Sequence, residues 1–277
     1  MRSLLFVPAD SGKKVPRALA SDADVVILDL EDSVALPDKP KARAMAREVL
    51  ASPRGRSRLF VRVNALASGL VGDDLAAVAA ARPDGLLLPK SESGGDAKRL
   101  IAMAKLPVIA IATETPAAMF NLGTYGGCGP DLLGLTWGME DLAAALGAQS
   151  NRDAQGRPTA PYDLARTLCL IGARAAGVEP IDGVYANFRD LAGLETQCRE
   201  AVRDGFTAKL CIHPDQVGVV NRVFTPSPEA VGRARRIVEA FAAAGGAGVI
   251  GLDGEMLDVP HLKAAKALLA RGRNRPG

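Results

Sequence analysis

The sequence has few aromatic residues and few cysteines. Phe, Trp and Tyr make up 4% of the 277 residues, which argues against a surface that stacks single-stranded nucleic acid on exposed rings. The four cysteines, Cys128, Cys169, Cys198 and Cys211, lie far apart, with no CxxC pair and no histidine pair nearby, so zinc and redox motifs are lacking. We therefore expect reduced thiols in a cytoplasmic protein.

The sequence also lacks an excess of either charge and the common nucleotide-binding motifs. Its 34 basic and 31 acidic residues give a net charge of +3, and the basic cluster Arg271, Arg273 and Arg275 is more typical of a cationic tail than of a nucleic-acid surface. No G-x-G-x-x-G follows the first apolar run, which disfavours the alternative architecture, an open doubly wound sheet. The apolar run before Pro8 is too short for a signal peptide or a membrane span.

Short apolar runs alternate with helical patterns along most of the chain. The eight runs lie at residues 3–7, 25–30, 59–63, 85–88, 108–112, 132–135, 183–185 and 209–212. Strands that alternate with helices form parallel βαβ units, and eight such units within about 250 residues is the usual size of a (β/α)₈ barrel. The sequence thus predicts an α/β protein, a TIM barrel over residues 1–225.

The remaining segment, residues 226–277, exceeds what a barrel needs. Helical patterns at 228–244 and 260–271 are separated there by a turn-rich stretch at 245–258. We expect this segment to cap the barrel or a neighbouring subunit as part of the same domain. Within the barrel, the polar stretch 151–158 is expected to be an inserted loop, and helices are expected at 40–51, 73–81, 96–105, 162–176 and 191–204.

The fifth apolar run ends on a carboxylate. Residues 108–112 are uniformly apolar, as in a strand buried on both faces, and Glu114 follows directly, with Pro116 suited to the first turn of a helix. The C-terminal mouth of a parallel barrel is where such enzymes carry their chemistry, so Glu114 is a candidate catalytic group. A solvated loop glutamate is the alternative.

Polar residues follow the other predicted strands as well, and they would converge on the same mouth. They are Asp10, Asp29, Glu31, Asp32, Arg62, Asn64, Lys90, Glu140, Asp141, Asn187 and His213. Crowded carboxylates repel one another unless a cation lies between them, and oxygen ligands without a histidine cluster favour Mg²⁺ over zinc. We therefore expect a Mg²⁺ site, with Glu114 and Asp141 as ligands because they end adjacent strands.

Two basic residues each have two interpretations. Arg62 lies in an apolar strand whose alternation directs it to the same side as Phe60, where it would meet either a substrate carboxylate or a neighbouring acid. Lys90 would serve as a Schiff-base nucleophile if it were desolvated, or form an ion pair with the nearby carboxylates, which is the favoured interpretation.

Several motifs together resemble those of citrate lyase beta-subunit-like proteins in the HpcH/HpaI aldolase and citrate lyase family of CoA-ester lyases. In chain order they are Ser3-Leu-Leu-Phe-Val-Pro8, Asp29-Leu-Glu-Asp-Ser33, Val61-Arg-Val-Asn64, Leu88-Pro-Lys90, Thr113-Glu-Thr-Pro116, Gly138-Met-Glu-Asp-Leu142, Lys209-Leu-Cys-Ile-His-Pro214 and Leu252-Asp-Gly-Glu-Met-Leu-Asp258. The resemblance covers nearly the whole chain. Glu255 and Ala208 depart from it, because the family commonly has lysine and glycine there.

The resemblance implies a homotrimeric or hexameric (β/α)₈ enzyme that uses Mg²⁺ to cleave a 3-hydroxyacyl-CoA into a shorter acyl-CoA and a 2-oxo acid. By motif position, Glu114 and Asp141 would bind the metal, Arg62 would hold the oxo-acid carboxylate, and Lys13 and Lys14 would bind the CoA phosphates. Asp253 resembles an acid that acts in a neighbouring subunit's site. Glu31, Asp32, Lys90 and Glu140 would surround the metal ligands.

The same motifs are compatible with other functions. The same metal site would support a malyl-CoA thioesterase or a malate-synthase-like enzyme if hydrolysis followed, and the chain would alternatively be the beta subunit of a multi-protein citrate lyase acting on a carrier-protein thioester. A metal-free aldolase that uses Lys90 is the last alternative. The general base is either Asp253 or a metal-bound water assisted by Glu31 or Asp32.

Overall fold

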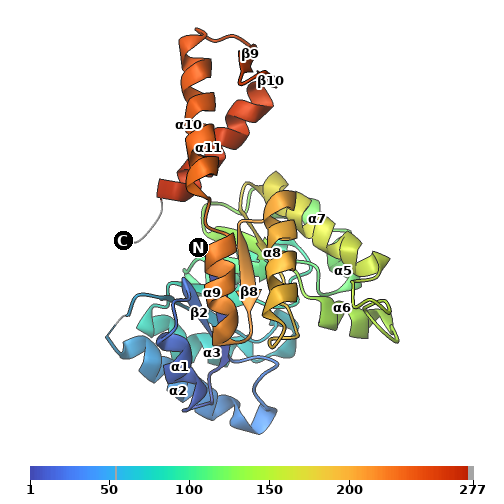
Figure 1. The fold of residues 1–277 in the computed structure, drawn as a ribbon. Coiled ribbons are helices and arrows are strands. Elements are labelled where there is room, and N and C mark those ends of the chain that lie inside the picture. Colours follow the sequence, from blue (N-terminus) through green and yellow to red (C-terminus); the bar gives the residue numbers. More distant parts are fainter. Residues whose placement is uncertain (54, 274–277) are drawn as a thin grey trace. The chain divides into compact units, whose positions relative to one another are not determined.

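A closed barrel of parallel strands forms the body of the chain (Figure 1). The structure is a computed structural model that describes residues 1–53 and 55–273. Within them the barrel strands follow one another in chain order, and β1 pairs with β8 to close the ring. The predicted (β/α)₈ barrel is therefore confirmed. Its strands are β1 Ser3–Pro8, β2 Val25–Asp29, β3 Arg58–Arg62, β4 Gly85–Leu88, β5 Val108–Ile111, β6 Leu132–Thr136, β7 Glu179–Asp182 and β8 Ala208–Cys211.

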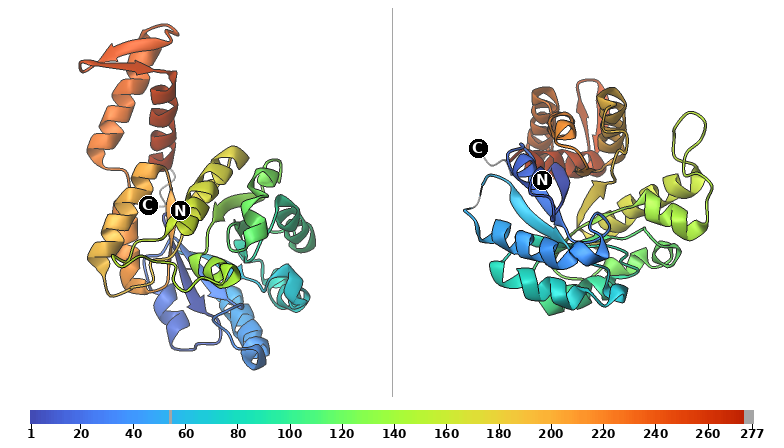
Figure 2. Two further views of the ribbon diagram at one scale, coloured as in Figure 1. Left: turned by 90° about the vertical axis from the view of Figure 1, so that its right-hand side faces the viewer. Right: turned by 90° about the horizontal axis from the view of Figure 1, so that it is seen from below.

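Helices connect the strands and cover the outside of the barrel (Figures 1 and 2). They are α1 Lys14–Leu19, α2 Lys39–Ala51, α3 Val71–Val78, α4 Gly94–Ala104, α5 Pro116–Met119, α6 Met139–Leu146, α7 Ala160–Ala176, α8 Leu191–Asp204 and α9 Pro214–Val223, with 3₁₀ turns at Leu36–Asp38, Leu66–Ser68, Ala79–Ala81 and Leu122–Tyr125. Spacings of three and four residues place their apolar side chains toward the strands; in α8 the buried residues are Leu194, Cys198 and Ala201. Among the helices of the described residues, none is long and apolar enough to cross a membrane.

The seventh strand was predicted in the wrong place. The apolar run at 183–185 is a loop, and β7 is Glu179–Asp182 instead. Pro180 makes this strand hard to predict from the sequence, because proline cannot donate a ladder hydrogen bond and is rare inside sheets. Here β7 is four residues long, and the Pro180 carbonyl still accepts a hydrogen bond from the Thr207 amide (3.0 Å).

Alternation along the strands separates the inside of the barrel from its outside. One apolar cluster contains alternate residues of all eight strands, among them Leu4, Ile27, Phe60 and Ile109, and is therefore the barrel interior. Two residues beyond Ile27 and Phe60 come Asp29 and Arg62, which face each other in the β2–β3 register. The period of two thus directs both charged side chains into the mouth of the barrel, as predicted for Arg62.

The chain divides into two compact units, Met1–Phe224 and Thr225–Gly277. In the second unit, α10 Pro228–Ala243 and α11 Val259–Arg273 lie side by side (Figure 1). They pack around a small core that includes Ile237, Phe241 and Leu257. The stretch predicted only as turn-rich holds a β-hairpin, β9 Val249–Leu252 and β10 Glu255–Asp258. Its two-residue turn, Asp253-Gly254, has both φ angles positive, at 51° and 82°, which is the geometry that an Asp-Gly pair favours between antiparallel strands. A capping role for this unit stays a prediction.

Candidate active site

An arginine–aspartate pair lies at the C-terminal mouth of the barrel. Both oxygens of the Asp29 carboxylate accept hydrogen bonds from Arg62, Oδ1 from Nε at 2.7 Å and Oδ2 from Nη2 at 2.6 Å. Burial alone would raise the pKa of Asp29, but the guanidinium outweighs it and lowers the pKa below its usual value. The guanidinium also lies over the Phe6 ring, with 4.8 Å between Cζ and the ring centroid. Arg62 is therefore held rigidly, with Nη1 as the nitrogen that Asp29 leaves open.

A second cation, Lys90, connects carboxylates of the loop after β2 with a carboxylate of α6. Its ammonium contacts Glu31 Oε1, Asp32 Oδ2 at 3.1 Å and Asp141 Oδ1 at 3.1 Å. Burial lowers the pKa of Lys90, but these carboxylates outweigh it and raise the pKa above the ordinary value. The amine stays protonated, which favours the ion-pair interpretation of Lys90 over the Schiff-base nucleophile.

Glu31 lies between the two cations. Its Oε1 meets the Lys90 ammonium and its Oε2 lies 3.1 Å from Arg62 Nη1. Its backbone is fixed as well, since the buried Lys39 ammonium donates to the carbonyls of Leu30 (2.8 Å) and Glu31 (3.1 Å). Lys39 thus fixes the backbone of the loop after β2, while the loop's carboxylates contact Arg62 and Lys90.

Glu114 is buried as well, with 3% of its surface exposed. It follows β5, which is buried along its whole length as predicted, and Oε2 accepts a hydrogen bond from the Lys90 amide at 2.7 Å. Burial and then the nearby Asp141 charge raise the pKa of Glu114 to about 8. Asp141 belongs to the first turn of α6, where the helix dipole favours a carboxylate.

The donor set at this position fits a hydrated Mg²⁺ ion. Two carboxylates from adjacent strand ends lie close enough that Asp141 raises the pKa of buried Glu114, so a cation would relieve their repulsion. Magnesium binds through one or two carboxylates and keeps several waters, whereas zinc takes nitrogen or sulfur ligands. The described residues contain no cluster of three or more His, Cys, Asp or Glu side chains suited to holding a metal.

Gly138 makes room for Glu114. A Cβ atom at residue 138 would lie 2.6 Å from both Cγ and Oε1 of Glu114, which is closer than real Cβ contacts come. The φ of Gly138 is −130°, which any residue can adopt, so the requirement for glycine is one of space rather than of backbone conformation. Gly138 is a residue of the site that the sequence analysis did not identify.

Gly138→Ala tests this packing. We expect kcat/KM to fall by about 100-fold, because a misplaced group near the chemistry costs roughly that factor, while the protein still folds. Gly218→Ala is the matched control: residue 218 lies inside α9 with open space around its Cα, so alanine there should leave activity unchanged and raise the free energy of unfolding by about 0.5–1 kcal/mol. Steady-state kinetics and urea unfolding measure both, and an active Gly138→Ala enzyme would show that Glu114 tolerates displacement.

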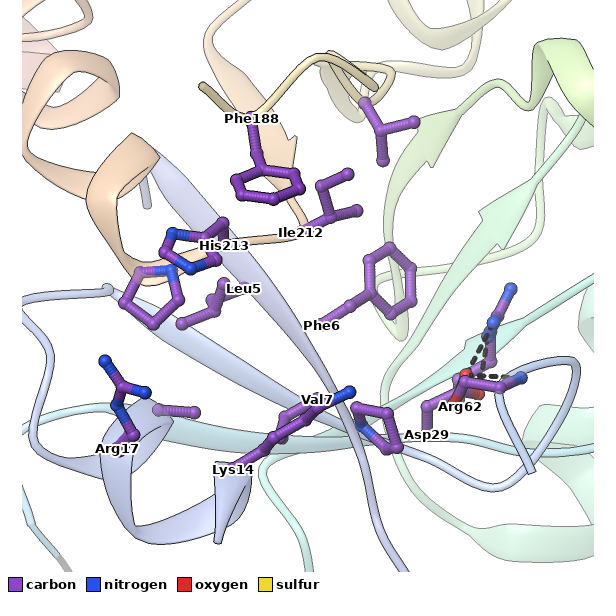
Figure 3. Close-up of a pocket in the computed structure, with 15 residues that line it drawn as sticks. Leu5, Phe6, Val7, Lys14, Arg17, Asp29, Arg62, Phe188, Ile212 and His213 are labelled. Atoms are coloured by element: carbon purple, nitrogen blue, oxygen red, sulfur yellow. Dashed lines mark hydrogen bonds and ion pairs between the residues drawn. The ribbon is translucent and has the colours of Figure 1, made fainter. Parts of the chain in front are cut away.

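A cavity of about 660 Å³ opens beside this cluster (Figure 3). Its far end is formed by Asp29 and Arg62, and one side is formed by Lys14 and Arg17 of α1. Across from them Phe188 and His213 stack, with ring centroids 4.8 Å apart. The cavity is thus apolar along most of its wall and cationic on the α1 side, which suits an extended ligand with an anionic end.

The sequence-predicted residues fall into two groups. The barrel mouth brings together Glu31, Asp32, Arg62, Lys90, Glu114 and Asp141, and Lys14 lines the adjoining cavity. Lys13 is exposed and is not among the lining residues. Glu140 is exposed and accepts a hydrogen bond from Asn151 in the inserted loop (2.8 Å). Asp253 belongs to the second unit, where it pairs with Arg236 at 3.0 Å.

Arg17 is the other residue that the sequence analysis missed. It stands three residues after Lys14, and that spacing places both side chains on one face of a helix. The signal was present in the sequence, but a helix of six residues is too short for its pattern to be recognised.

A (β/α)₈ barrel with a buried glutamate, a fixed arginine and neighbouring carboxylates at its C-terminal mouth is the structure of a barrel enzyme with metal-assisted chemistry. The chain belongs to the HpcH/HpaI aldolase/citrate lyase family, whose sequence model matches residues 2–214. Membership confirms the resemblance found in the motifs and the predicted class of enzyme, a carbon–carbon lyase.

Relatives and solved structures agree with this assignment over almost the full chain. The chain is 35% identical over 274 residues to a (3S)-malyl-CoA thioesterase of Cereibacter sphaeroides, covering 98% of this chain and 94% of that protein. It is 34% identical over 291 residues to the mitochondrial citramalyl-CoA lyase of Rattus norvegicus, covering 97% and 85%. The crystal structure of Mycobacterium tuberculosis CitE in complex with magnesium, acetoacetate and coenzyme A matches with a TM-score of 0.82 and 35% identity, covering 98% and 97%.

Proposed function

We propose that this protein is a Mg²⁺-dependent lyase that cleaves the C–C bond of a 3-hydroxyacyl-CoA, such as citramalyl-CoA or malyl-CoA, to a shorter acyl-CoA and a 2-oxo acid. The observation that carries the proposal is the pair of adjacent carboxylates, Glu114 and Asp141, beside the fixed guanidinium of Arg62. The citramalyl-CoA lyase relative and the magnesium and coenzyme A in the matching structure support the substrate class and the metal.

Arg62 is suited to hold the carboxylate of the oxo acid. Asp29 occupies Nε and Nη2, so an incoming carboxylate would bind at Nη1, where Glu31 now lies at 3.1 Å. Because Asp29 fixes the plane of the guanidinium, little conformational freedom is lost when the substrate binds. The Phe6 ring beneath the guanidinium adds to this fixation.

Mg²⁺ held by Glu114 and Asp141 would polarise the oxygen that becomes the keto group and stabilise the charge that develops during cleavage. The rest of the substrate would extend into the cavity, with the CoA phosphates near Lys14 and Arg17. Lys13, which precedes α1, would add to the positive charge at the entrance.

Asp253 is proposed as the general base, supplied to the site by a neighbouring subunit of a homotrimer or hexamer. The proposal rests on the motif resemblance and on the position of Asp253 at the tip of a hairpin, where its side chain is half exposed.

Mixed oligomers test the role of Asp253. Asp253→Asn should have less than about 1% of wild-type kcat, since a general base contributes roughly 10²–10⁴-fold. Glu114→Gln should fall as far, because it loses a carboxylate of the proposed metal site. Unfolding and reassembling the two variants together should restore part of the activity, because some sites then combine an intact Glu114 with an intact Asp253 from another chain. If mixing restores nothing although hybrids form, the base acts within its own subunit or elsewhere.

Product analysis tests the function as a whole. Mass spectrometry after incubation with citramalyl-CoA, malyl-CoA and citryl-CoA should show a shorter acyl-CoA and a 2-oxo acid in equal amounts, with Mg²⁺ and not with EDTA. Free CoA with an intact hydroxy acid would instead indicate a thioesterase, the activity named for the Cereibacter sphaeroides relative. Cleavage only of a carrier-protein thioester would indicate the beta subunit of a citrate lyase.

A further inference from the structure

Lys90 has an uncommon backbone conformation and lies among the carboxylates of the barrel mouth. Its φ of 49° lies in the left-handed region, which a non-glycine residue occupies at a cost in free energy. Such residues are retained where the surrounding structure needs them, and they cluster at active sites. In this conformation the amide donates to Glu114 Oε2 while the side chain projects among other carboxylates.

The Lys90 ammonium joins two separate parts of the mouth. Glu31 and Asp32 come from the loop after β2, whereas Asp141 comes from the first turn of α6. Its side chain is partly exposed, at 30%, so the ammonium has space to move among these partners. The contacts with Asp32 and Asp141 are equally long, at 3.1 Å, and neither is a buried, saturated pair like Arg62–Asp29.

The mouth has more carboxylates than cations, and Lys90 is one of its two cations. Five carboxylates, Asp29, Glu31, Asp32, Glu114 and Asp141, face two cations, Arg62 and Lys90. Arg62 is bound in a bidentate pair with Asp29, so Lys90 is the main counter-ion for the remaining acids.

We propose that Lys90 and the divalent cation compete for Asp141. In the metal-free protein the ammonium neutralises Asp141, and when a divalent cation binds, Lys90 withdraws to Glu31 and Asp32 while its amide keeps Glu114 in place. Lys90 therefore weakens metal binding and keeps the metal exchangeable. This inference rests on the proposed function, because it assigns the metal to Glu114 and Asp141.

An alternative role for Lys90, holding the metal ligands in position, predicts a change in the metal Kd of the opposite direction. If Lys90 only held the ligands in position, removing its charge would disorder Asp141 and weaken metal binding. If it competes, removing a positive charge next to a divalent cation strengthens binding, because like charges at this distance repel in a partly buried site. The direction of the change in Kd therefore separates the two roles.

The experiment measures Mn²⁺ binding by the electron paramagnetic resonance signal of the free ion, with Mg²⁺ as competitor, in wild type, Lys90→Gln and Lys90→Arg. We expect the Kd of Lys90→Gln to fall by about tenfold or more. Lys90→Arg keeps the charge and should remain within about threefold of wild type. Lys90→Asn is a second uncharged variant, since asparagine tolerates a left-handed backbone well.

Each outcome bears on the proposal. An unchanged or raised Kd in folded Lys90→Gln and Lys90→Asn, with normal binding by wild type, would overturn the competition while leaving the proposed function intact. Failure of wild type itself to bind Mn²⁺ would contradict the proposed function and this inference together. Thermal unfolding in EDTA confirms that each variant is folded before its Kd is compared.

Discussion

Glu114→Gln will lower kcat/KM by roughly 10³-fold, the rate equivalent of about 4 kcal/mol of lost transition-state stabilisation. Glutamine keeps the shape of the side chain and can still accept the Lys90 amide, but it lacks the charge that would bind the metal. Mn²⁺ affinity should fall in parallel. The matched control is Glu140→Gln, since the carboxylate of Glu140 is exposed and accepts a hydrogen bond from Asn151. This variant should keep kcat/KM within about threefold of wild type.

The same variant has a distinct effect on stability. Burial raises the pKa of Glu114 to about 8 in the folded protein, above its ordinary value of 4.5. Folding therefore favours the protonated carboxyl of Glu114. Its contribution to the free energy of unfolding is fully present below pH 4.5 and is lost as the pH rises toward 8. Each unit of this shift corresponds to about 1.4 kcal/mol.

In EDTA, wild type should thus lose stability relative to Glu114→Gln between about pH 5 and 8, and Mg²⁺ should remove that loss in wild type alone. Urea unfolding at several pH values measures the difference. A pH-independent difference between the two proteins would show that Glu114 titrates normally. Wild-type activity in Glu114→Gln would remove this residue from the proposed metal site altogether.

Arg62→Met will have the second largest effect, on both activity and stability. We expect kcat/KM to fall by about 10²–10³-fold, because the group that would neutralise the oxo-acid carboxylate is gone. The free energy of unfolding should fall by about 3–5 kcal/mol, because Asp29 is left buried without its partner. Arg199→Ala, which removes an exposed i,i+4 pair with Glu195, is the control and should cost at most about 0.5 kcal/mol.

The double variant Asp29→Asn with Arg62→Met separates the two effects of Arg62. Neutralising Asp29 removes the uncompensated buried charge, so part of the lost stability should return while kcat/KM stays low. The asparagine oxygen can still accept a hydrogen bond from one of the two backbone amides that now bind Asp29, Glu31 at Oδ1 or Ser33 at Oδ2. Recovery of activity together with stability would instead mean that Arg62 acts only through the fold.

Much of this architecture follows from local sequence patterns. The run at 108–112 has no polar alternation, and the strand is buried along its length because helices cover its outer face and side chains fill the barrel inside. The period of two in β3 likewise places Arg62 inside with Phe60. These features depend on neighbours in sequence, and for that reason they could be predicted.

Other features depend on contacts between distant segments. Gly138 is required by Glu114, 24 positions earlier, and no local pattern indicates that clash. Lys90 reaches the carboxylates of Asp32 and Glu31, 58 and 59 positions before it, a connection that only the closed barrel creates. β7 was misplaced because Pro180 is atypical for a strand, and the Asp253-Gly254 hairpin was overlooked although an Asp-Gly turn is a strong hairpin signal.

The central claim is that a divalent cation binds between Glu114 and Asp141, beside Arg62. The most direct test is a crystal of the protein soaked with Mn²⁺ and measured at a wavelength where manganese scatters anomalously. The account predicts one strong peak about 2.0–2.3 Å from a carboxylate oxygen of each residue, with Lys90 Nζ displaced from Asp141. A peak at any other carboxylates, or none in crystals that diffract well and contain Mn²⁺, would contradict it.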